Sequence, residues 1–257
     1  MDYQFIKTWD ADGAAWISIN RPPLNVLDIP TMEEINDALT VVKARELEVR
    51  ALVLTAEGDK AFSAGVDVAD HTEDKVEYMI DVFHRIFYNL AQLQIPTIGA
   101  VKGAALGGGC ELAIFCDMIV AADNLKIGQP EIQVGVFPPL AVVMLPRLIP
   151  EKRAFELVAG GGVIRAAEAS ALGLVNQVVP LGSFGEEFGA FLKRFTSLSG
   201  SVLRSTKKAV RAAKGLGFAD ALHSVERIYL DELMVTDDAK EGLKAFMDKR
   251  APVWKHT

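Results

Sequence analysis

The chain alternates between short apolar runs and longer segments in which apolar residues recur every three or four positions. Continuous apolar runs at 51–55, 97–101 and 118–121 predict strands that are buried on both faces. Apolar stripes at helical spacing predict a helix from about residue 30 and another over 74–92. The β-rich runs 4–8 and 14–19 flank Asp10-Ala-Asp-Gly13 and predict a hairpin. This alternation predicts an α/β fold with a largely parallel sheet.

From about residue 151 the pattern becomes mostly helical. It predicts helices over 151–159, 166–172, 185–196, 201–213, 218–233 and 237–250. A single sheet cannot cover so many amphipathic helices. We therefore expect a core domain over residues 1–195 and a helical C-terminal region over 196–257, part of which covers a neighbouring subunit or the active site.

Composition narrows the class of protein. The 257 residues are 50% hydrophobic and 24% charged, as in a globular protein, and no apolar run reaches the ~18 residues that span a bilayer. The N-terminus does not resemble a signal peptide, and Cys110 and Cys116 are too few for a disulfide framework, so we expect a cytoplasmic location with no membrane contact. A net charge of −7 argues against nucleic-acid binding, although it permits a small anionic ligand.

The densest candidate for chemistry is the segment 103–111, in which four glycines precede Glu111. Glycines between a buried strand and a helix let the backbone approach a ligand, and they leave N–H groups free to bind a phosphate or an oxyanion. A tight structural turn would explain the glycines alone. Glu111, however, stands in an otherwise apolar helix, where a carboxylate is costly unless it is paired or used.

A second glutamate, Glu131, follows Gly128-Gln-Pro130 and again lies among apolar residues. Taken alone, it is most simply an exposed loop carboxylate. Two such glutamates beside glycine-bearing turns favour an acid–base pair, because burial raises carboxyl pKa values toward neutrality.

A third segment, Lys60 to Asp67, is a turn of small residues whose backbone N–H groups are suited to half of an oxyanion hole. The four histidines and two cysteines form no group at metal-ligand spacing, so we expect no metal site.

Together these segments resemble the crotonase, or enoyl-CoA hydratase and isomerase, superfamily. The resemblance runs through nearly the whole chain. It is carried by Asn20-Arg-Pro-Pro-Leu-Asn25, Ala61-Phe-Ser-Ala-Gly-Val-Asp67, the glycine-rich segment to Asp117, Gly128-Gln-Pro-Glu-Ile132, Ala171-Leu-Gly-Leu-Val-Asn176 and Lys240-Glu-Gly-Leu-Lys-Ala-Phe246.

The resemblance implies the crotonase (ClpP-like) fold, a spiral of βαβ repeats with a helical C-terminal region that builds a homotrimer, commonly paired into a hexamer. It also implies an oxyanion hole formed by the N–H groups of Val66 and Gly108. Hydratases of this family carry both glutamates, whereas many isomerases and hydrolases keep one, so Glu111 and Glu131 favour hydration. Glu111 would help to deprotonate water and Glu131 would exchange a proton with the substrate carbon. Coenzyme A would enter as part of the substrate, with no separate cofactor.

The resemblance assigns coenzyme A contacts as well. Leu24, Ala64 and Asp67 match segments that wrap the pantetheine and adenine. Phe246 and Lys249 match C-terminal positions that reach a coenzyme A site, often that of a neighbouring subunit. For Lys249, a solvated lysine at a helix end is an equally simple explanation.

One segment departs from the family pattern. Ordinary short-chain hydratases have a proline and a glycine-rich turn after Gly135, whereas this chain has a proline pair and branched apolar residues. We expect this change to form a stiff acyl-pocket wall, although a proline pair can also simply start a helix. The wall residues are Phe137, Pro138, Pro139 and Val142. The segment is similar to that of alicyclic dienoyl-CoA hydratases, which act on cyclohexa-1,5-diene-1-carbonyl-CoA in anaerobic degradation of aromatic compounds.

Several alternatives remain open at this level. Within the superfamily they are a short-chain enoyl-CoA hydratase, an enoyl-CoA isomerase and an acyl-CoA hydrolase. A non-enzymatic relative that binds RNA or coenzyme A is an alternative of another class, against which the acidic charge balance speaks.

Overall fold

The computed structural model describes residues 2–256. Its strands are β1 (Ile6–Ala11), β2 (Ala14–Ile19), β3 (Ala51–Ala56), β4 (Ala61–Ser63), β5 (Thr97–Val101), β6 (Ala104–Leu106), β7 (Met118–Ala122), β8 (Lys126–Gly128), β9 (Val163–Arg165) and β10 (Gln177–Val179). Its α-helices are α1 (Ile29–Ala44), α2 (Val76–Gln92), α3 (Gly108–Phe115), α4 (Pro139–Leu148), α5 (Glu151–Gly160), α6 (Ala166–Ala171), α7 (Phe184–Thr196), α8 (Gly200–Ala212), α9 (Phe218–Arg227) and α10 (Asp237–Met247). Short 3₁₀ turns are η1 (Val68–Asp70), η2 (Pro130–Val134) and η3 (Leu181–Ser183), and η4 (Ile228–Leu233) is a π-helical turn.

The strands form two sheets. The larger has the order β1-β2-β3-β5-β7-β10, and it is parallel except for the β1–β2 hairpin. The smaller has the order β4-β6-β8-β9, in which only β8 and β9 are antiparallel. Successive turns of the chain, β3-β4, β5-β6 and β7-β8, each give one strand to each sheet. The chain is therefore a spiral, and the predicted α/β class with a largely parallel sheet is confirmed.

The core explains why the long strands were readable from the sequence. Strands β3, β5 and β7 lie in the middle of the larger sheet, and nearly all of their residues are buried. One face of that sheet packs against α7 through Phe184, Phe188 and Leu192. The other face packs against the main core, to which α1, α2 and α3 contribute. A strand covered on both faces has to be apolar throughout, as these strands are.

The smaller sheet was missed by the sequence analysis. Its strands are three residues each, too short to show a period of two. Likewise, β9 and β10 interrupt the region from residue 151, for which only helices were predicted. These short strands nevertheless place the functional segments. The segments that follow β4, β6 and β8 contain Val66, Gly108 and Glu131, and they leave the carboxyl ends of three adjacent parallel strands.

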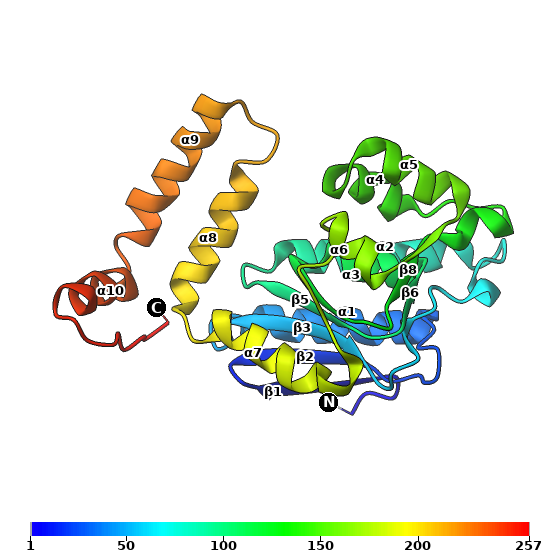
Figure 1. Ribbon diagram of the computed structural model, residues 1–257, viewed down its shortest axis with the longest axis horizontal. Helices are drawn as coiled ribbons and strands as arrows, with labels where there is room; N and C mark the ends of the chain where they lie inside the picture. Colours follow the sequence, from blue (N-terminus) through cyan, green and yellow to red (C-terminus); the bar gives the residue numbers. More distant parts are fainter. Residues whose placement is uncertain (1, 257) are drawn as a thin grey trace.

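Helices α8, α9 and α10 stand to one side of the core as an arm (Figure 1). Two basic side chains of α8 fasten the arm. Buried Lys207 bonds to Ile95 O at 2.7 Å and pairs with Asp117 at 2.6 Å, and Arg211 donates to Ala91 O at 2.6 Å. Helix α7 ends at Thr196, next to the predicted boundary between residues 1–195 and 196–257, and that division stays a prediction. No helix within residues 2–256 has both the length and the apolarity needed to cross a membrane.

Candidate active site

Glu111 lies in the first turn of α3 and is only 2% exposed. Its Oε1 accepts a hydrogen bond of 2.8 Å from the backbone N–H of Ala141, and the N–H of Leu140 also donates to it. Both donors belong to the first turn of α4, which starts at Pro139. First-turn N–H groups have no partner inside their own helix, and they carry the positive end of the helix dipole. The start of α4 therefore holds the Glu111 carboxylate.

Glu131 lies in η2 and is half-buried. It comes close to the backbone of Gly107, because a Cβ on Gly107 would lie 2.4 Å from Glu131 Oε1. Gly107 also has φ +54°, so a larger residue would be strained there and would displace the carboxylate. The side chain of Gln129 is fully buried beside it. With its amide nitrogen facing Glu131, Gln129 donates to both carboxylate oxygens, at 3.1 and 3.2 Å.

Burial makes both carboxyl groups weaker acids than usual. It raises the pKa of Glu111 to about 7, an effect opposed by the N–H of Ala141 and increased by the negative charge of Glu131. Burial also raises the pKa of Glu131. The two groups interact, so their titrations are linked. A carboxyl group with a pKa near neutrality, such as Glu111, can both give and take protons at physiological pH.

Two backbone N–H groups meet beside this pair. A Cβ on Gly108 would lie 3.3 Å from Val66 N, which places the two peptide groups side by side. Gly108 is the first residue of α3. Val66 lies opposite Leu27 in a β-bridge whose hydrogen bonds are made by Gly65 O and Asp67 N. Within residues 2–256 neither N–H donates a hydrogen bond. Two neighbouring free donors, one buried and one partly buried, suit a developing oxyanion.

A family model described as enoyl-CoA hydratase/isomerase matches residues 10–257. The chain belongs to this family.

Relatives of known name support the assignment. Crotonyl-CoA hydratase of Syntrophomonas wolfei is 36% identical, with 97% of each chain covered. Cyclohexa-1,5-dienecarbonyl-CoA hydratase of Thauera aromatica is 33% identical over 98% of this chain and 97% of the relative. A crystal structure of an enoyl-CoA hydratase from Bacillus anthracis superimposes with a TM-score of 0.93 at 32% identity, covering 99% of this chain and all of that one. The crotonase fold is confirmed, and the enzyme is a hydro-lyase of the enoyl-CoA hydratase type.

Three of the five coenzyme A positions implied by the enoyl-CoA hydratase resemblance come together. Leu24 O accepts a hydrogen bond of 2.9 Å from Ala64 N, and Asp67 N donates to Leu27 O, three residues after Leu24, at 3.1 Å. Next to Leu24 is a depression of about 510 Å³. It is lined by Gln4, Phe5, Asn20, Arg21, Pro22, Pro23, Leu24 and Val26.

The other two positions do not join them within one protomer. Phe246 is 84% exposed on α10, and Lys249 follows that helix with φ +53°. Helix α10 lies at the opposite end of the molecule from α4 and α5 (Figure 1).

The predicted acyl-wall residues lie where η2 leads into α4. Pro138 is buried and Pro139 is the first residue of α4, so the proline pair does start a helix. Phe137 and Val142 remain 62% and 44% exposed. Sequence reasoning missed the more consequential role of this turn, which is to aim two N–H groups of α4 at Glu111. It also missed Gln129, whose only signal was a polar residue next to Pro130-Glu131.

Within residues 2–256 no group of three His, Cys, Asp or Glu side chains is placed to hold a metal ion. The predicted absence of a metal and of a separate cofactor stays a prediction.

Proposed function

We propose that this enzyme adds water across the double bond of a conjugated enoyl-CoA thioester, with Glu111 and Glu131 as its acid–base pair. The observation that carries the proposal is the meeting of two carboxyl groups of raised pKa with the two free N–H groups of Val66 and Gly108. A coenzyme A thioester binds along Leu24, Ala64 and Asp67, with its carbonyl oxygen on the two N–H groups.

In the forward reaction Glu111 takes a proton from water, whose oxygen bonds to the β-carbon of the substrate. The π electrons move to the thioester oxygen, and the resulting enolate is stabilised by the N–H groups of Val66 and Gly108. Glu131 then delivers a proton to the α-carbon. Water's two protons and oxygen are accounted for once Glu111 and Glu131 exchange protons with solvent, so the step needs no cofactor.

For the acyl group, we propose an alicyclic dienoyl-CoA, cyclohexa-1,5-diene-1-carbonyl-CoA, in the anaerobic degradation of aromatic compounds. Phe137 and Val142 are apolar and exposed beside the start of α4, and Pro138-Pro139 stiffens that turn. A broad stiff wall suits a ring better than a flexible chain. The relative that acts on this ring is 33% identical, and the relative that acts on crotonyl-CoA is 36% identical, so a linear substrate is the alternative.

A substrate panel decides between the two. A ring-shaped pocket predicts that kcat/KM for the cyclic diene exceeds that for crotonyl-CoA by at least ~100-fold, or about 2.7 kcal/mol of transition-state binding. Phe137→Ala should narrow the gap by weakening the cyclic substrate. Phe155→Ala, at a 72% exposed position on α5, should leave it unchanged. Equal turnover of both wild-type substrates would refute the alicyclic assignment, and release of free coenzyme A would show a hydrolase instead.

We also propose that the chain works as a homotrimer or a dimer of trimers. The arm carries large apolar side chains that the protomer leaves exposed: Val210, Phe218, Leu222, Tyr229, Leu230, Val235, Leu243, Phe246 and Met247. So much exposed apolar surface on one region marks a protein interface. The cytoplasmic location expected from the sequence stays a prediction.

A further inference from the structure

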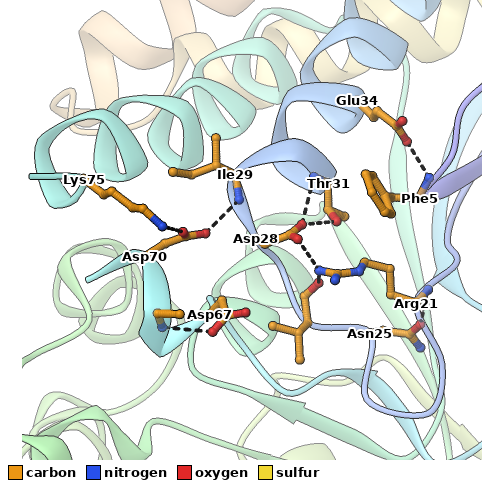
Figure 2. A network of polar contacts seen from close by, with 12 residues as sticks. Phe5, Arg21, Asn25, Asp28, Ile29, Thr31, Glu34, Asp67, Asp70 and Lys75 are labelled. Carbon is orange, nitrogen blue, oxygen red and sulfur yellow. Dashed lines mark hydrogen bonds and ion pairs between the residues drawn. The ribbon is translucent and has the colours of Figure 1, made fainter. Parts of the chain in front are cut away.

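Asp70 is a buried carboxylate outside the acid–base pair. It ends η1, four residues after Val66, and is only 8% exposed. Its Oδ2 accepts a hydrogen bond of 3.0 Å from the backbone N–H of Ile29, and its Oδ1 pairs with Lys75 Nζ at 3.2 Å (Figure 2). A buried carboxylate is costly unless it is paired. Here it caps the first turn of α1 from a distant part of the chain, where the helix dipole favours a negative charge.

The same α1 entry segment also holds the backbone on both sides of Val66. Leu27 N donates to Gly65 O at 2.9 Å, and Leu27 O accepts from Asp67 N at 3.1 Å. These bonds fix the peptide groups that flank Val66 and leave its own N–H free. Gly65 precedes Val66 and has φ +107°, and a glycine by itself does not restrict the backbone there. The direction of the Val66 N–H thus depends on ties to residues 27–29.

The anchor itself is rigid. Asp28 caps α1 through Thr31 N at 3.1 Å and Thr31 Oγ1 at 2.5 Å, and it pairs with Arg21 at 2.6 Å (Figure 2). The start of α1 is therefore fixed by its own residues. Asp70 adds a side-chain tie, beyond the backbone bond from Asp67 N to Leu27 O, that joins the loop after Val66 to this fixed point.

We propose that Asp70 is a positioning residue, which holds the segment 66–70 on the start of α1 and so keeps the Val66 N–H in line with that of Gly108. The inference rests on the proposed oxyanion role of Val66. An oxyanion donor acts only within a narrow range of distance and direction, so a small drift of this loop weakens transition-state binding more than ground-state binding.

The test uses the full-length enzyme with crotonyl-CoA for kinetics and cinnamoyl-CoA as a spectroscopic probe. The absorption band of cinnamoyl-CoA moves to longer wavelength when its carbonyl is polarised. Asp70→Ala should lower kcat by ~10- to ~100-fold with KM within about threefold, and should reduce the band shift of the bound probe. Asp70→Asn keeps an oxygen for the Ile29 N–H and loses only the ion pair with the half-exposed Lys75, so it should restore most of kcat and most of the band shift.

Glu46 provides a matched control at the other end of α1. It too is 8% exposed, accepts a backbone N–H (Gln94 N, 3.1 Å) and pairs with a lysine (Lys43, 2.7 Å). Glu46→Ala should lower the melting temperature as Asp70→Ala does, but leave kcat and the band shift at wild-type values. If Asp70→Ala does not fold, Ile29→Pro decides, compared with Ile29→Ala. Proline is accepted at the first helical position and removes only the N–H that Asp70 binds.

The outcomes separate the two proposals. Wild-type kcat and band shift in folded Asp70→Ala, or in Ile29→Pro relative to Ile29→Ala, would overturn the positioning role. A wild-type enzyme that neither hydrates any enoyl-CoA nor shifts the probe band would instead overturn the proposed function. Loss of kcat with an unchanged band shift would also reject the alignment of the Val66 N–H.

Discussion

The pKa of Glu111 depends on its buried place at the start of α3 and on its contact with the start of α4. Burial raises its pKa to about 7, and the N–H groups of Leu140 and Ala141 keep the rise from being larger. The glutamate's place in an apolar helix was enough to single it out from the sequence. Its partners were not predictable, because they come from a helix thirty residues on whose contact with α3 depends on tertiary packing.

Loss of either carboxyl group should abolish most of the chemistry. Glu111→Gln and Glu131→Gln should each lower kcat by at least ~100-fold while leaving the fold intact, the size expected of acid–base residues. Steady-state hydration of the preferred substrate measures this, with circular dichroism to check folding. A glutamine variant that hydrates at the wild-type rate would remove that glutamate from the mechanism.

The raised pKa of Glu111 also makes stability depend on pH. Between its ordinary pKa of 4.5 and about 7, the folded chain keeps a proton that the unfolded chain has lost. This contribution to stability is complete below about pH 4.5 and is lost as the pH rises through 7. Glu111→Gln cannot ionise, so its stability relative to wild type should rise by about 3 kcal/mol between pH 4.5 and pH 8.

Urea unfolding of both proteins at each pH, at one protein concentration, gives this difference directly. A difference that stays constant across the range would mean that Glu111 titrates normally.

At the scale of elements, the site is built at the carboxyl ends of β4, β6 and β8. The glycine-rich turn, the small-residue turn and the Gln-Pro-Glu turn were all identified from the sequence. That they belong to neighbouring strands was not, because a three-residue strand leaves no periodic pattern. The long buried strands and helices were readable since their apolar runs and stripes are long. The smaller sheet, which brings the chemistry together, had to be seen in three dimensions.

The start of α3 can be tested for its role as a donor. Gly108 is the first residue of that helix, a position where proline is well accepted, so Gly108→Pro removes the N–H with little cost to the helix. It also adds a Cβ, which would meet Val66 Cγ2 at 2.8 Å and Phe83 Cζ at 3.0 Å. Gly108→Ala adds the same Cβ and keeps the N–H. We expect kcat for Gly108→Pro to be at least ~100-fold below that for Gly108→Ala.

Equal activity of the two folded variants would show that space, and not the N–H group, matters at position 108. Reduced binding of cinnamoyl-CoA by both variants alike would lead to the same conclusion.

For the whole molecule, the arm is the least self-sufficient part. Its helices were predicted from amphipathic apolar stripes. The helices form, but within one protomer many of their large apolar side chains stay exposed to solvent. A hydrophobic stripe indicates that a helix face is buried, without indicating by which chain. The exposed Phe246 and the position of α10 at the end of the arm (Figure 1) are what we would expect if a neighbouring chain completes the coenzyme A site.

Sedimentation of the purified enzyme should therefore show a trimer or a hexamer. Phe218→Asp with Leu222→Asp, both on α9, should reduce the assembly to smaller species and raise KM for the thioester. Tyr88→Asp, at a 69% exposed position on α2 of the core, should leave the assembly intact. A wild-type monomer with full activity would contradict the proposed assembly.

The spiral has a consequence for how the enzyme comes into being. Val66, Gly108 and Glu131 leave three consecutive turns, and the donors to Glu111 come from the helix after the third. A chain leaving the ribosome therefore presents the oxyanion donor Val66 first, then Gly108, and then Glu131. The N–H groups that hold Glu111 appear only once α4 has emerged. The catalytic groups of this fold are therefore all present only after most of the large sheet exists, and the arm is made after them.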